Sequence, residues 1–235
     1  MSDKDAPAGM DKRQVIKSGD LDVGVHRMWG PPIAKYVVPE DVVKKANALV
    51  DKYQKNDQKR KQNDYAYNLA GEISQEFMPT GDELAEIGLA EHMLKAVEMM
   101  VRGKVPEMDS NKLRIGFIDC WFVIQKAGDW NPPHYHGGQL SAALWLDTPE
   151  GMATSTRKWG GGEFVFVAPC TPTEWEQPVV HFEPVPGMMV VFPAYLTHAV
   201  APHMAEGERR SFAFNCNLGF EVNGEVVPFE GIYPG

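Results

Sequence analysis

The feature that most constrains the fold is a change in the hydrophobic pattern of the sequence near residue 113. Before it, residues 39–55 and 82–101 carry apolar side chains at spacings of three and four, which predicts two amphipathic helices. After it come short runs rich in β-branched and aromatic residues, separated by Gly, Pro, Asn and Asp. They lie at 114–125, 139–147, 162–168, 181–185, 187–194, 209–220 and 224–229. Short strands with frequent turns predict a β-sandwich or barrel.

The domain organisation follows from this order. Two helices and their loops bury too little surface to fold alone, so we expect them to cover one face of the β region. The sequence therefore predicts a single domain over residues 1–235, with a helical support region at about 1–112 and a β core at about 113–235. The fold class is mainly β (α+β), a jelly roll or double-stranded β-helix with an N-terminal helical layer.

Composition excludes several classes of partner and site. The net charge of −9 is opposite in sign to that of a general nucleic-acid binder, so a nucleic-acid partner is not expected. We expect no membrane partner either, because no run of 18 apolar residues occurs. The chain has 3 widely spaced cysteines without a CxxC pair, and its N-terminus lacks the apolar segment of a signal peptide. These features predict a cytoplasmic protein.

Three histidines are candidate metal ligands. His134 and His136 form an HxH pair, and alternate residues of an extended chain point to the same face. The preceding prolines indicate a loop, which places the pair where a loop enters a strand, at a barrel mouth. His198 follows a predicted buried strand and can return to the same mouth. Imidazole suits iron, zinc, copper or nickel, and each histidine alone is more often structural.

A polar strand face carries a candidate anion site. In the run at 209–216, Arg209 and Ser211 share one face with Ala213, while Arg210 and Phe212 share the other. Arginine offers a fixed fork of donors that fits a carboxylate, and a serine two residues on adds a hydroxyl donor. An outer solvent face is the ordinary alternative for such a strand.

These motifs together resemble a known enzyme family. The order of HxH, GGEFVFV, PGMMVVFPAYLTHAV and ERRSFAFN is similar to that of the Fe(II)- and 2-oxoglutarate-dependent oxygenases, in the prolyl-hydroxylase-like branch with many bacterial and phage members. The resemblance covers about residues 121–220. The segment NLAGEISQEF at 68–77 resembles an N-terminal piece of that branch less specifically.

The resemblance implies a role for each matching residue. His134 and His198 match two of the family's metal ligands, and Arg209 and Ser211 match the pair that holds the distal carboxylate of 2-oxoglutarate. His136 stands where the family usually has Asp or Glu, so three neutral imidazoles replace the usual two-His-one-carboxylate set. The implied protein is a dioxygenase that uses Fe(II), 2-oxoglutarate and dioxygen to hydroxylate a C–H bond of a small molecule or protein side chain.

Several alternatives stay open on the sequence alone. Asp129 and Asp147 are the nearest spare carboxylates for the third ligand, although neither has the expected spacing, and zinc also suits three histidines. Trp121, Gln125 and Asn131 are candidates for lining the pocket, and no catalytic group beyond the metal ligands is expected. The competing functions are a cupin-type dioxygenase without 2-oxoglutarate and a non-catalytic jelly-roll binding module. Neither of these gives the Arg-x-Ser pair the role that the resemblance does.

Overall fold

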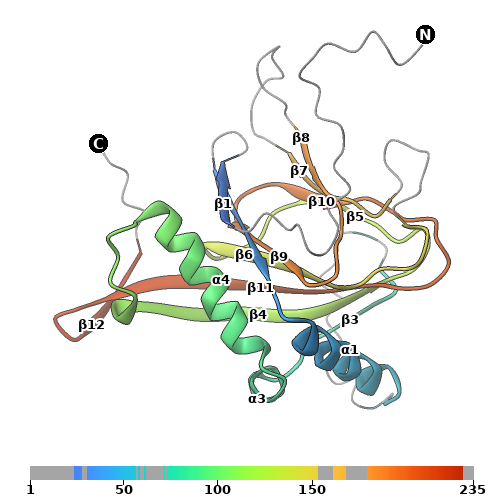
Figure 1. Cartoon of the computed structure of the whole chain (residues 1–235), viewed down its shortest axis with the longest axis horizontal. Coiled ribbons are helices and arrows are strands. Elements are labelled where there is room, and N and C mark those ends of the chain that lie inside the picture. The colour runs from blue at the N-terminus through green and yellow to red at the C-terminus, as the bar shows by residue number, and fades with distance from the viewer. Residues whose placement is uncertain are drawn as a thin grey trace, which may run out of the picture.

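Two facing antiparallel β-sheets form the centre of the molecule (Figure 1). The computed structural model describes residues 24–27, 31–56, 58, 61, 71, 73–152, 161–167 and 179–229. In the large sheet the strand order is β1-β2-β9-β6-β11-β4-β3, with β12 paired to β11. Its strands are β1 (Gly24–Arg27), β2 (Pro32–Val37), β3 (Gln75–Phe77), β4 (Leu113–Gln125), β6 (Leu140–Asp147), β9 (Met188–Pro193), β11 (Arg209–Val222) and β12 (Glu225–Pro228).

The small sheet has the strand order β5-β10-β7-β8. Its strands are β5 (Asn131–His134), β7 (Phe164–Val167), β8 (Val179–Phe182) and β10 (His198–Val200). An aromatic cluster lies between the two sheets, where Trp145 from the large sheet meets Phe164, Phe166 and Phe182 from the small one. This arrangement confirms the predicted jelly roll, or double-stranded β-helix.

The helices cover the outer face of the large sheet. Helix α1 (Glu40–Gln54) begins after Pro39 with acidic residues in its first turn, which favours a helix N-terminus. All six apolar residues of its predicted stripe are buried: Val42, Val43, Ala46, Leu49, Val50 and Tyr53. They pack in one core with Phe122 of β4 and with Phe212 and Phe214 of β11.

The second predicted helix is interrupted. The periodic segment at 82–101 forms α3 (Gly81–Glu86) and α4 (Leu89–Lys104), followed by the short 3₁₀ helix η2 (Ser110–Lys112). The break falls at Gly88, whose φ of +81° lies in the left-handed region that glycine adopts at low cost. A capping box between Thr80 and Glu83 fixes the start of α3.

Strands in the first half of the chain were not predicted. β1, β2 and β3 all belong to the large sheet, so the region before residue 113 is only partly a helical support. β1 and β2 extend one edge of the sheet, and β3 pairs with β4 at the other edge. No helix among the described residues is long and apolar enough to cross a membrane. The single domain and the cytoplasmic location stay predictions.

Candidate active site

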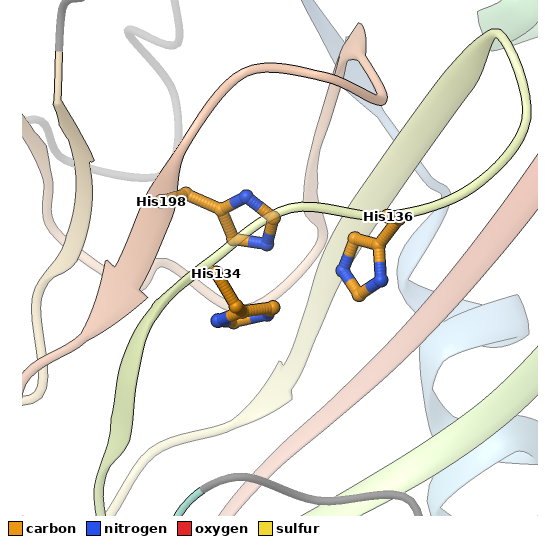
Figure 2. A group of neighbouring side chains, drawn as sticks. All are labelled: His134, His136 and His198. Atoms are coloured by element: carbon orange, nitrogen blue, oxygen red, sulfur yellow. The ribbon is translucent and has the colours of Figure 1, made fainter.

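Three histidine side chains converge between the two sheets. His134 ends β5, His198 begins β10, and His136 lies two residues beyond β5. One ring nitrogen of each lies within 4.8 Å of those of the other two, and the rings surround a common space (Figure 2). Among the described residues, these are the only His, Cys, Asp and Glu side chains grouped closely enough to hold a metal ion.

The backbone brings these histidines together. His134 and His198 are direct partners in the antiparallel pairing of β5 with β10, and the His136 N–H donates to the carbonyl of Ala194 at 3.0 Å. The HxH motif therefore lies where a strand ends, whereas the sequence predicted a loop entering a strand. Pro132 and Pro133 caused that error, because proline is tolerated in edge strands and β5 is an edge of the small sheet.

Hydrogen bonds to backbone carbonyls fix the orientation of two of the imidazole rings. Nδ1 of His134 donates to the carbonyl of Pro132 at 2.7 Å, and Nδ1 of His198 donates to the carbonyl of Leu196 at 2.9 Å. A carbonyl only accepts, so the proton of each ring lies on Nδ1 and the lone pair lies on Nε2. The Asn131 amide nitrogen is 3.5 Å from Nε2 of His134, on the acceptor side of the ring. This arrangement is typical of metal-binding histidine.

Burial keeps the three imidazoles neutral. Desolvation lowers the pKa of His134, lowers that of His136 to about 4 and holds that of His198 well below its ordinary value. The proximity of the other imidazoles adds to the lowering for His136 and His198. A metal binds only the neutral imidazole, so the site needs no deprotonation at neutral pH to accept one.

Aromatic side chains surround the histidines. His198 is 2% exposed and stacks on Phe164, with ring centroids 5.1 Å apart and planes 19° apart. Phe192 meets the same ring edge-on, with the ring centroids 4.9 Å apart. Trp121 lies against the His136 ring, with the centroids 5.6 Å apart. His198 thus lies deeper than the barrel mouth predicted from the sequence, while His134 and His136 are half-buried.

A cavity of about 210 Å³ joins the histidines to the polar face of β11. Arg209, Ser211 and Ala213 line it, as the two-residue period of a strand predicts. Arg210 points to the opposite face, where it contacts Asp51 of α1 at 2.8 Å. Arg209 and Arg210 therefore lie on opposite faces of β11, as the sequence predicts. Arg210, however, packs on a helix instead of pointing to solvent.

Arg209 is a buried cation with no carboxylate partner among the described residues. Its side chain is 2% exposed, and Nη1 donates to Oε1 of Gln125, while Nε has no hydrogen bond to any described residue. Burial lowers the pKa of Arg209 to about 10, and the group stays charged at neutral pH. A buried charge without a counter-ion is costly, so this end of the cavity suits an anion.

Of the other residues that the sequence suggested for the site, three line the cavity and two do not. Trp121, Gln125 and Asn131 all line the cavity. Asp129 accepts hydrogen bonds from the N–H groups of Ser74 and Lys126 in a turn, and Asp147 accepts one from Thr148. Neither aspartate is in the histidine group, so the structure offers no carboxylate there as a third ligand among the described residues.

The acidic residue of the cavity was not identified from the sequence. Glu76 of β3 is 3% exposed and lines the same cavity as the histidines and Arg209. It lies at the end of the segment 68–77, of which the described residues are 71 and 73–77. Its strand is three residues long, and a mixed sequence such as Gln-Glu-Phe carries no periodicity that could mark it as a strand.

Comparison with known proteins supports the sequence-based resemblance. Residues 119–215 match the family model described as "Putative 2OG-Fe(II) oxygenase", and this segment contains His134, His136, His198, Arg209 and Ser211. A comparison with curated proteins finds no match. The family match therefore agrees, over this part of the chain, with the resemblance to 2-oxoglutarate-dependent oxygenases that the motifs indicate.

Solved structures match most of this chain at low sequence identity, and the first of the three below supports a similar fold. AviO1 from Streptomyces viridochromogenes Tue57 is 16% identical, with 83% of this chain and 92% of that chain covered at a TM-score of 0.51. A prolyl-4-hydroxylase from Pseudomonas putida is 18% identical, with 78% and 91% covered at a TM-score of 0.49. A viral collagen prolyl hydroxylase from Paramecium Bursaria Chlorella virus-1, in complex with 2-oxoglutarate, is 15% identical, with 78% and 94% covered at 0.49.

Proposed function

We propose that this chain is a 2OG-Fe(II) oxygenase, the family whose model matches residues 119–215, and that it hydroxylates a C–H bond of a small molecule or protein side chain. In this proposal His134, His136 and His198 hold Fe(II), and Arg209 and Ser211 hold 2-oxoglutarate. The observation that carries it is the position of a buried guanidinium, which has no carboxylate partner among the described residues, in the cavity that the three histidines also line.

The donor set fits Fe(II). Three neutral imidazoles with their nitrogens within 4.8 Å of one another suit a divalent first-row metal, and backbone acceptors hold two of the rings with Nε2 available. Because no ligand is anionic, the bound ion would keep its full charge of +2. A 2-oxoglutarate dianion neutralises that charge, so we expect metal and cosubstrate to strengthen each other's binding.

The clamp fits the far end of 2-oxoglutarate. Arg209 and Ser211 are alternate residues of β11 and present their donors to one face. Gln125, the Cα partner of Arg209 in β4, accepts from Nη1 and holds the guanidinium in place. A carboxylate placed there would receive charge-assisted hydrogen bonds in a site that excludes water.

The protein's own contribution is binding, orientation and exclusion of water. When bound, Fe(II) and 2-oxoglutarate supply the oxidising chemistry, in which dioxygen converts the oxo acid to succinate and carbon dioxide and hydroxylates a C–H bond. Phe164 and Phe192 exclude water from behind His198, and Trp121 covers one edge of His136. Asn131 and Gln125 add polar contacts along the wall.

Product analysis tests this function. Purified protein supplied with Fe(II), dioxygen and 2-oxoglutarate should release succinate, and the rate should rise with the correct substrate. The measurement is succinate by mass spectrometry together with oxygen consumption. Oxygen consumption that does not depend on 2-oxoglutarate would favour the cupin-type alternative. The absence of both succinate release and oxygen consumption across a broad panel of substrates would favour a binding module.

The unusual third ligand gives a separate prediction. The variant His136→Asp should retain iron, because carboxylate and imidazole both suit Fe(II) and the variant restores the set usual in the family. His136→Ala should retain much less, since it leaves two protein ligands. The measurement is metal content after dialysis, with circular dichroism to verify folding. Equal iron content in the alanine variant and the wild type would show that His136 is not a ligand.

A further inference from the structure

Glu76 is the one acidic side chain among the described residues that line the cavity. It lies on β3, where it is the direct partner of Val123 on β4, and the Val123 side chain also lines the cavity. Its neighbour Phe77 packs in the opposite core with the helices, as strand alternation requires. The carboxylate therefore belongs to the inner wall of the site and is 3% exposed.

Glu76 and Arg209 come from strands that are not direct neighbours in the sheet. Strand β4 lies between β3 and β11 in the sheet, and neighbouring strands are about 4.7–4.9 Å apart, so the two backbones are roughly 10 Å apart. Burial alone lowers the pKa of Arg209, which agrees with a carboxylate too distant to offset it. Glu76 is also not part of the histidine group. A cosubstrate held between Arg209 and the histidines leaves the Glu76 side for the substrate.

We propose that Glu76 is a specificity-determining residue that receives a cationic group of the substrate, a primary ammonium or a guanidinium. This inference rests on the proposed function, because it takes the Arg209 side of the cavity to be filled by 2-oxoglutarate. A carboxylate in a water-poor wall attracts a cation far more strongly than the same group on the surface. It has acceptor sites for several donors, so a contact within the protein leaves room for a substrate group.

The size and the lining of the cavity further restrict the class of substrate that fits. Its volume of about 210 Å³ is below the 300–1,000 Å³ common for small-molecule sites, so only one side chain or a slender molecule fits beside the cosubstrate. Val123, Trp121 and Ile73 line it with Glu76 and would contact an alkyl chain. An alkyl chain that ends in a cation matches this combination. The net charge of −9 also attracts cations to the protein.

Binding measurements on the full chain can test this inference without turnover. Protein loaded with Ni(II), a redox-inert substitute for Fe(II), and with 2-oxoglutarate is titrated with Nα-acetyl-lysine methylamide and Nα-acetyl-arginine methylamide. Their uncharged counterparts, the Nε-acetyl-lysine and citrulline derivatives, are titrated in parallel. We expect at least one cation to bind the wild type about ten- to a hundredfold more tightly than its neutral counterpart.

The isosteric variant Glu76→Gln should remove that preference and leave the affinity for 2-oxoglutarate unchanged. Glu208→Gln is the matched control, because Glu208 pairs with Arg210 on the other face of the sheet, and it should keep the preference. Normal 2-oxoglutarate binding with no preference for either cation, or a preference that survives Glu76→Gln, would overturn this inference alone. Failure of the wild type to bind 2-oxoglutarate would overturn the proposed function first.

Discussion

Replacing Arg209 with alanine is expected to weaken 2-oxoglutarate binding between about thirtyfold and a few thousandfold. The guanidinium is 2% exposed and has no carboxylate partner among the described residues, so the cosubstrate would be its counter-ion. Removing one partner of a buried charge pair costs roughly 2–5 kcal/mol, and each 1.4 kcal/mol is a factor of ten. Calorimetric titration of the Ni(II) protein with 2-oxoglutarate measures this loss directly.

Arg210→Ala is the matched control for that measurement. Arg210 is the next residue of β11, but it contacts Asp51 of α1 at 2.8 Å and Glu208 at 3.0 Å on the helix side of the sheet. The variant should lose thermal stability, because these contacts join α1 to β11, while its affinity for 2-oxoglutarate stays near that of the wild type. Equal losses of affinity in the two variants would contradict the assignment of Arg209 as the clamp.

Strand and helix periodicity in the sequence was enough to predict the layers of the fold and one wall of the site. The stripe of α1 and the alternation of residues 209–215 each have one buried apolar face, so hydrophobic spacing reports their orientation directly. The convergence of His134 with His198 could be expected only from the order of motifs. Their pairing across β5 and β10 depends on contacts 64 residues apart, which no local pattern contains.

The features that the sequence analysis did not predict also have physical explanations. Pro132 and Pro133 resemble a loop, yet an edge strand accommodates residues that lack an N–H. Gly88 breaks the second helix although the apolar spacing continues past it. Glu76 lies on a three-residue strand whose assignment depends on pairing with β4. In each case tertiary contacts decide the local structure, and the cavity carboxylate could not be found without them.

The second large expected effect concerns His198 in the candidate metal site. His198 is packed among Phe164, Phe166 and Phe192, so alanine at this position would leave a cavity and destabilise the core. A residue at the barrel mouth, where the sequence placed His198, would carry no such cost. His198→Gln fills most of the same space, and comparison of the metal-free proteins isolates its effect on folding.

His198→Gln should abolish stabilisation by metal. A ligand that binds only the folded state at a hundred times its dissociation constant adds about 2.7 kcal/mol to the free energy of unfolding. The wild type should show that rise with Ni(II) or with Fe(II) under anaerobic conditions, and the variant should show almost none at the same concentration. Denaturant unfolding with and without metal gives the two free energies.

His203→Gln provides the matched control, because His203 is also a buried histidine, 1% exposed, but lies outside the group of three candidate ligands. Its Nε2 bonds to the backbone carbonyl of Gln125 at 3.2 Å, so the substitution disturbs the barrel without touching a proposed ligand. This variant should start from a lower stability and still gain the full increment with metal. If His203→Gln loses the increment and His198→Gln keeps it, the metal lies elsewhere, and the assignment of His134, His136 and His198 as its ligands is wrong.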